Sequence, residues 1–173
     1  MKSNNAKTRL LTLTGMLTAM TTVATIVIQI PTLTKGYVNL GDTIVNISAW
    51  ILGGMYGGFA GGVGSALADI ITGYFVYAPA TLIIKFLMAF VGFKVYNVCT
   101  KKFSSLVARI TSAVVSEIIM ITGYSIFAGF MYSSVQSAIL SIPDNIAQGI
   151  MGAVFAVVIY ECILKRVPAL KIK

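Results

Sequence analysis

The hydrophobic positions of this chain form long, nearly unbroken stretches, and the polar positions collect in short segments between them. Six such stretches lie at residues 10–30, 43–56, 59–76, 81–98, 107–131 and 142–164. A helix that crosses a bilayer needs about 20 largely apolar residues. The pattern therefore predicts an all-α integral membrane protein, with residues 1–173 forming a single domain of six transmembrane helices.

Residues 43–76 admit two interpretations, because they are apolar for longer than one ordinary span. Glycines recur there with a spacing of four, as Gly53, Gly57, Gly61 and as Gly54, Gly58, Gly62. In a single helix they would form a face of small residues for close packing. In two helices they would form a tight turn between the arms.

The Lys and Arg residues decide between these interpretations. If the N-terminus is cytoplasmic and residues 43–76 cross twice, all but two of the 13 fall on the cytoplasmic side. The exceptions are Lys35, in an outer loop, and Lys85, within a span. Short cytoplasmic loops retain Lys and Arg. We therefore predict cytoplasmic termini and two helices with a turn near residues 56–60. The cytoplasmic group is Lys2, Lys7, Arg9, Lys94, Lys101, Lys102, Arg109, Lys165, Arg166, Lys171 and Lys173.

Prolines mark two further helix starts. Pro79 suits the first turn of the fourth helix, and Pro143 is expected to begin the sixth helix after an outer loop at residues 132–141. Proline is favoured in a first helical turn because its missing N–H would have no partner there.

Composition excludes several classes of protein. Hydrophobic residues make up 57% and charged residues 10%, whereas soluble domains carry roughly 25% charged residues. The net charge of +8 is assigned to loops that flank the membrane. Nucleic-acid binding is not expected, because no basic face with stacking aromatic residues is visible.

Catalytic and metal-binding chemistry is missing from the sequence. It contains no His and two Cys, Cys99 and Cys162, both at the cytoplasmic ends of spans. A disulfide is not expected in that reducing compartment. The glycine-rich run also lacks the Lys and Ser/Thr of a phosphate-binding loop. We expect no catalytic residues, no metal site and no cofactor.

Polar groups concentrate in the outer half of the predicted bundle. A charged residue within a span costs roughly 2.5–3.5 kcal/mol on insertion scales, so each one needs a reason. Their clustering with aromatic residues predicts an outward-facing pocket for a small polar aromatic molecule. The candidate binding residues are Tyr37, Asn39, Asp42, Asp69, Tyr74, Tyr77, Lys85, Tyr124, Asp144, Asn145 and Gln148.

Structural roles compete with binding at several of these positions. Tyrosines at span ends commonly form interface belts, and Asp69 and Lys85 could form an ion pair between neighbouring helices. Glu117 is either a neutral buried acid or a proton site. Trp50 is expected in the packed core, and Glu161 is expected as a solvated or paired surface charge.

Two segments resemble a known family. YVNLGDTIVNISAWILGGMYGGFAGG (37–62) and GSALADIITGYFVYAPATLIIKFLMAFVGF (64–93) are similar to the substrate-binding S components of energy-coupling factor (ECF) vitamin transporters. The resemblance implies capture of a vitamin outside a prokaryotic cell and a location in its plasma membrane. It also implies a transmembrane coupling subunit and two cytoplasmic ATPases as partners, with no catalysis in this chain.

The resemblance also indicates a partner surface and a ligand class. In this family an AxxxA motif on the first helix packs against the coupling subunit, and Gly15 and Ala19 stand at the matching positions here. The similarity favours hydroxymethylpyrimidine and pyridoxine equally, with riboflavin as the alternative. A self-sufficient proton-coupled transporter using Asp69 or Glu117, or a structural protein without ligand, are the competing functions.

Overall fold

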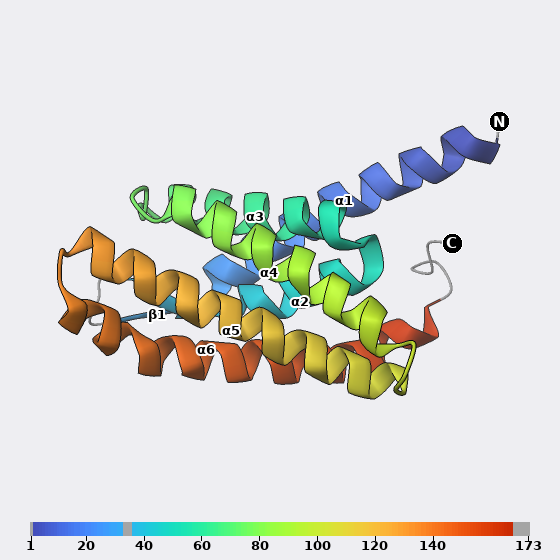
Figure 1. Cartoon of the computed structure of the whole chain (residues 1–173). Coiled ribbons are helices and arrows are strands. Elements are labelled where there is room, and N and C mark those ends of the chain that lie inside the picture. Colours follow the sequence, from blue (N-terminus) through green and yellow to red (C-terminus); the bar gives the residue numbers. More distant parts are fainter. Residues whose placement is uncertain (1, 33–35, 168–173) are drawn as a thin grey trace.

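A computed structural model describes residues 2–32 and 36–167 as a helical bundle with a small β-hairpin (Figure 1). Lys35, Lys171 and Lys173 lie outside the described residues. The elements in chain order are α1 (Lys2–Val27), β1 (Gln29–Pro31), β2 (Tyr37–Asn39), α2 (Gly41–Leu52), α3 (Gly54–Ile71), α4 (Ala78–Cys99), α5 (Ser105–Met131), α6 (Val135–Cys162) and the 3-10 helix η1 (Leu164–Arg166). The prediction of an all-helical membrane protein is confirmed, with one short antiparallel strand pair added.

Four helices are long and apolar enough to cross a membrane. They are α1 from residue 6 onward, α4, α5, and α6 together with η1. Large apolar side chains on their outer faces, such as Ile126 and Phe130 on α5, are exposed to the surroundings, as contact with lipid requires. The chain is therefore a multi-pass membrane protein.

The prediction of six spans is not confirmed, because the other two helices, α2 and α3, are not among these four. Helix α2 has 12 residues and α3 has 18. At 1.5 Å per residue, α2 is about 18 Å long, well below the roughly 30 Å of a bilayer core. Helix α2 instead lies inside the molecule, in contact with α1, α3, α4 and α6, and 11 of its residues are buried.

Different elements meet at the two ends of the bundle (Figure 1). The start of α1, the α4–α5 turn and η1 lie at one end, which we name the basic end for Lys101, Lys102, Lys165 and Arg166. The β-hairpin, the α3–α4 turn and the α5–α6 turn lie at the other, which we name the pocket end. This arrangement follows from helices that alternate in direction along the chain.

The turn between α2 and α3 is at Gly53, not at residues 56–60 as predicted. Gly53 has a φ of 85°, a conformation that residues with a side chain rarely adopt. The later glycines belong to α3 and serve packing instead. A Cβ on Gly57 would lie 2.8 Å from Ala49 Cα on α2, and one on Gly58 would lie 2.7 Å from the Phe86 ring on α4. Each glycine series therefore faces a different neighbouring helix.

Helix α6 begins earlier than predicted. Its first residue is Val135, and Pro143 lies inside the helix; the expected outer loop at residues 132–141 is mostly helical. The Ser134 hydroxyl accepts a hydrogen bond from the Ser137 N–H, and such a cap supports a helix start at this point. Membrane helices tolerate an internal proline when neighbouring groups satisfy the freed backbone. Asp144 therefore lies within α6, not at its beginning.

Two apolar clusters include residues of α2. Ile47 and Trp50 pack with Leu17 and Ala156 toward the basic end, whereas Val45 packs with Met88 and Met120 toward the pocket end. The Trp50 indole N–H donates to the Ser112 hydroxyl at 3.1 Å. Trp50 is thus a core residue with its one polar atom satisfied, as its position in the sequence suggested.

Candidate functional site

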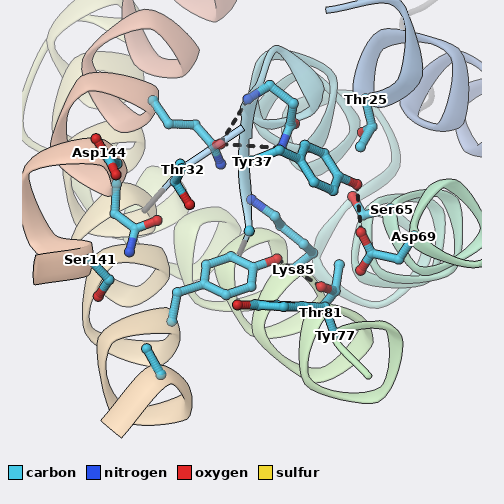
Figure 2. Close-up of a pocket in the computed structure, with 16 residues that line it drawn as sticks. Thr25, Thr32, Tyr37, Ser65, Asp69, Tyr77, Thr81, Lys85, Ser141 and Asp144 are labelled. Carbon is cyan, nitrogen blue, oxygen red and sulfur yellow. Dashed lines mark hydrogen bonds between the residues drawn. The ribbon is translucent and has the colours of Figure 1, made fainter. Parts of the chain in front are cut away.

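A cavity of about 50 Å³ opens at the pocket end, between the β-hairpin and helices α1, α3, α4, α5 and α6 (Figure 2). Nine of the predicted binding residues line it: Tyr37, Asn39, Asp69, Tyr77, Lys85, Tyr124, Asp144, Asn145 and Gln148. Asp42 and Tyr74 lie behind this lining. A water molecule needs about 10–15 Å³ of such space, so the cavity has room for a few waters. An organic ligand requires the lining to move outward.

The floor of the cavity is a buried ion pair. Lys85 Nζ, on α4, donates to Asp42 Oδ1, at the start of α2, and the two side chains are 2% and 0% exposed. The sequence allowed an ion pair between Asp69 and Lys85, whereas in the structure Lys85 pairs with Asp42. Asp42 can pair with Lys85 because the start of α2 lies between α4 and α6, where Asp42 contacts both Lys85 and Gln148.

Gln148 ties three elements together beside this ion pair. Its Nε2 donates to Asp42 Oδ2 at 2.7 Å, and its Oε1 accepts from the Asn39 backbone N–H at 2.9 Å and from Asn39 Nδ2 at 3.2 Å. Gln148 thereby connects α6 with α2 and with strand β2. Each of its polar atoms has a partner, so its role includes holding the hairpin in place.

Glu117 extends the polar network away from the cavity. Its Oε1 accepts from Asn46 Nδ2 at 2.8 Å, and Asn46 also donates to the Asp42 carbonyl at 3.0 Å. Its Oε2 has no hydrogen-bond partner among the described residues. Gly152 makes room here, because a Cβ at this position would lie 2.7 Å from Asp42 Cβ and 3.0 Å from Glu117 Oε1.

Asp69 forms a second buried site on the opposite wall. Tyr37, on β2, donates its phenolic proton to Asp69 Oδ1 at 2.5 Å. Burial raises the pKa of Tyr37 above its ordinary value, and the neighbouring Asp69 carboxylate raises this pKa further. Tyr37 therefore remains protonated and keeps donating to Asp69 at neutral pH. The Thr81 hydroxyl of α4 is also close to this carboxylate.

Aromatic rings pack against one another beside the cavity. The Tyr37 and Tyr74 ring centroids are 4.7 Å apart, those of Tyr74 and Tyr77 are 6.3 Å apart, and Tyr77 contacts Phe127 at 5.3 Å. Burial is also the main cause of the raised pKa of Tyr77. Tyr74 thus supports the two tyrosines that line the cavity without lining it itself.

Tyr124 occupies the α5 wall of the cavity. Its ring centroid is 5.2 Å from Lys85 Nζ, and its hydroxyl donates to Thr81 at 3.0 Å. Asp144 and Asn145, on α6, are half-buried at the cavity wall. The predicted polar and aromatic residues therefore converge from five helices and one strand.

Seven lining residues were not predicted from sequence: Thr25, Thr32, Gly36, Ser65, Thr81, Ala128 and Ser141. Hydroxyl and small residues are common in membrane helices, so none of them stands out in the chain. Thr25 carries the one available signal, because it continues the run of threonines on α1 to the pocket end.

The predicted partner residues lie on an open face of α1. A Cβ on Gly15 would meet no atom within 4 Å, and Gly15 and Ala19 are both exposed. Ala19 also lines an apolar groove between α1 and the start of α2, together with Met16, Met20 and Val23. Small exposed residues of this kind permit the close approach of another helix.

Groups that could hold a metal ion are missing from the described part of the chain, where no three His, Cys, Asp or Glu side chains cluster suitably. Cys99 and Cys162 are free thiols. At the basic end, Glu161 pairs with Arg109 and, at 2.8 Å, with Lys165.

Two comparisons bear on the identity of the chain. A sequence model of the family described as "ECF-type riboflavin transporter, S component" matches residues 5–165. The chain is also similar to a Pyrococcus woesei protein described as "Uncharacterized protein in gap 3'region". The two are 35% identical over 135 residues, which cover 77% of this chain and 86% of that protein.

Proposed function

Because the chain belongs to the ECF-type riboflavin transporter S component family, and is therefore a substrate-binding subunit of an ECF transporter, we propose that it captures hydroxymethylpyrimidine or pyridoxine outside a prokaryotic cell. ATP hydrolysis by two cytoplasmic ATPases drives delivery of the vitamin through a transmembrane coupling subunit. The chain itself is not catalytic and resides in the plasma membrane, with its basic end in the cytoplasm.

The convergence of buried polar groups and tyrosines on one cavity carries the proposal. Asp69, Lys85 and Gln148 are each at most 3% exposed, which is costly unless the arrangement serves binding or folding. Tyr37, Tyr77 and Tyr124 supply rings against which a flat ligand can pack. Both favoured vitamins are small heteroaromatic alcohols that match this combination of rings and hydrogen-bonding groups.

Riboflavin is the second candidate, and the family description supports it. The size of the cavity favours the smaller vitamins. At about 50 Å³ it requires some expansion for a single ring and considerably more for the three fused rings and ribityl chain of riboflavin. Pockets for drug-sized ligands span roughly 300–1,000 Å³.

Coupling to partners is assigned to α1. Gly15 and Ala19 stand on its open face, where a helix of the coupling subunit can approach closely. This surface lies outside the cavity lining. Binding of the vitamin and assembly with partners are therefore expected to be separable by mutation.

Equilibrium binding to the purified full chain in detergent tests the proposal. The panel comprises hydroxymethylpyrimidine, pyridoxine, thiamine, riboflavin and pantothenate as radiolabelled tracers. Trp50 is remote from the cavity lining and hydrogen-bonded to Ser112, so its fluorescence is a poor reporter. Saturable binding of hydroxymethylpyrimidine or pyridoxine without ATP is the expected result. Tight binding of riboflavin alone would favour the second candidate, and no binding by folded protein would contradict both.

A further inference from the structure

The two walls of the cavity differ in how far their buried polar groups are satisfied (Figure 2). On α4, α5 and α6, Lys85 and Gln148 donate to Asp42, and Tyr124 donates to Thr81. On α1 and α3, three polar atoms have no hydrogen-bond partner among residues 2–32 and 36–167: Thr25 Oγ1, Ser65 Oγ and Asp69 Oδ2. The buried groups that remain for a ligand are therefore on the α1–α3 wall.

Thr25 differs from the threonines that precede it on α1. Thr14, Thr18 and Thr21 each donate to the backbone carbonyl four residues earlier, at 2.8 Å. Thr25 continues the same spacing and is 2% exposed, yet its hydroxyl lacks such a bond. A buried hydroxyl without a partner is destabilising, and a bound ligand would remove this cost.

The charges of the lining do not balance. Lys85 is the one cation among the described lining residues, and its charge is balanced by the ion pair with Asp42, which lies behind it. Asp69 and Asp144 remain. Of these, Asp69 is 3% exposed, and its Oδ1 accepts from the Tyr37 hydroxyl. Its Oδ2 has no hydrogen-bond partner among the described residues, although the Thr81 hydroxyl is near the carboxylate. Charges interact strongly where water is excluded. An anionic ligand would therefore be repelled, whereas a cationic ligand or one that donates hydrogen bonds would be attracted.

We infer that the ligand presents an amino group of a heteroaromatic ring to Asp69 Oδ2, with Thr25 and Ser65 contacting the same edge of that ring. This inference rests on the proposed function and narrows it to non-anionic, amino-bearing heteroaromatic molecules. An aminopyrimidine carries its amino group, a donor, beside a ring nitrogen, an acceptor. The amino group can donate to Asp69 Oδ2 while the ring nitrogen accepts from the hydroxyl of Thr25 or Ser65. The aromatic ring of pyridoxine bears no amino group, so hydroxymethylpyrimidine fits better.

A matched pair of probes tests this inference on the purified full chain. One is hydroxymethylpyrimidine, and the other is its analogue with the ring amino group replaced by an oxo group. The wild type is expected to bind the oxo analogue roughly 10- to 100-fold more weakly, the range for a hydrogen bond to a charged group. The affinity of Asp69→Asn for hydroxymethylpyrimidine is expected to be lower than that of the wild type by a similar factor. Its affinities for the two probes should be nearly equal.

Two threonines on one helix provide a matched control. Thr25→Val is expected to weaken binding of hydroxymethylpyrimidine several-fold, because its hydroxyl is assigned to the ligand. Thr21→Val is expected to leave binding unchanged, because the Thr21 hydroxyl already bonds to the Leu17 carbonyl. If Asp69→Asn fails to fold, the inference is still tested by comparing Thr25→Val with Thr21→Val and by measuring the affinity of the wild type for both probes. Lys35→Gln, outside the described residues, is expected to keep the preference for the amino probe.

Three results would overturn the inference while leaving capture of a vitamin intact. They are equal affinity of the wild type for both probes, tight binding of the carboxylate pantothenate, and loss of the amino preference in Lys35→Gln. Failure of the whole vitamin panel to bind would instead overturn the proposed function, and this inference with it.

Discussion

Lys85 carries a positive charge into a region from which water is excluded, and Asp42 is the residue that makes this possible. The two side chains are almost fully buried, and Gln148 satisfies the second oxygen of Asp42. Desolvation of both charges is costly and is offset only when geometry and further hydrogen bonds are good. Lys85 therefore contributes to folding as well as to the floor of the cavity.

Lys85→Met is expected to destabilise the protein by about 3–5 kcal/mol, because it leaves the Asp42 carboxylate buried without its cation. Unfolding in increasing fractions of sodium dodecyl sulfate, followed by circular dichroism, measures the effect. The double variant Lys85→Met with Asp42→Asn should recover much of the loss, since neither charge remains. Equal stability of Lys85→Met and wild type would show that the pair does not hold α2 to α4.

Helix α3 packs against three neighbouring helices, α1, α2 and α4, and its glycines lie at these contacts. Gly57 and Gly61 face α2, Gly58 and Gly62 face α4, and Gly64 approaches the Thr18 carbonyl of α1. Gly57, Gly62 and Gly64 approach backbone atoms of the neighbouring helix, whereas Gly58 and Gly61 make room for the side chains of Phe86 and Val45. Small residues on three faces of one helix allow three neighbours to pack against it at short distance.

Gly57→Ala is expected to cost roughly 1–3 kcal/mol or more, because the added Cβ would press on the backbone of Ala49 and Ser48. Gly15→Ala is the matched control on an open helix face, where nothing lies within 4 Å. There the better helix propensity of Ala should stabilise by roughly 0.5–1 kcal/mol. Thermal unfolding of both variants in one detergent compares them, and equal midpoints would contradict the packing role.

The glycine pattern shows what sequence can and cannot give at the scale of elements. Its spacing of four is visible in the sequence, and the charges indicate that residues 43–76 form two helices. Neither observation distinguishes Gly53 from residues 56–60 as the turn. The positive φ of Gly53 follows from how α2 meets α3. The prediction that Pro143 begins the sixth helix is wrong for a similar reason. Whether a helix can contain a proline depends on neighbouring groups, and the sequence does not show which groups lie nearby.

At the scale of the whole molecule, the cavity proposed to bind the vitamin and the surface proposed to bind the coupling subunit are separate. The cavity lies at the pocket end, whereas Gly15 and Ala19 lie on an outer face of α1. This separation suits a subunit that captures its ligand and then engages partners through a different surface. Within the family, S components are the substrate-binding subunits of ECF transporters.

Gly15→Leu and Ala19→Leu are each expected to abolish assembly with the coupling subunit and uptake by cells, because leucine would prevent close helix approach. Ligand affinity of the purified variants should stay within about two-fold of wild type, since neither residue touches the cavity. Co-purification with the coupling subunit and ATPases measures assembly. Normal transport by both variants would place the partner surface elsewhere.

The sequence predicts most of the polar and aromatic residues of the pocket, but it does not predict which of them pair with one another. Alternating helices bring the outer polar residues together, which is why Asp69, Lys85 and Gln148 were expected at one end. The pairing of Lys85 with Asp42, and not with Asp69, depends on where the β-hairpin and the start of α2 lie relative to α4 and α6. Three-residue strands leave no hydrophobic pattern long enough to predict.

The short length of α2 has a consequence for how the protein is made. A segment of 12 residues that includes Asp42 and Asn46 is a poor substrate for insertion on its own, because insertion depends on apolar length. Its polar groups find Lys85, Glu117 and Gln148 only after α4, α5 and α6 have been synthesised. Residues 41–52 should therefore stay accessible to aqueous labelling in ribosome-bound chains that end before α4, and become protected once translation is complete.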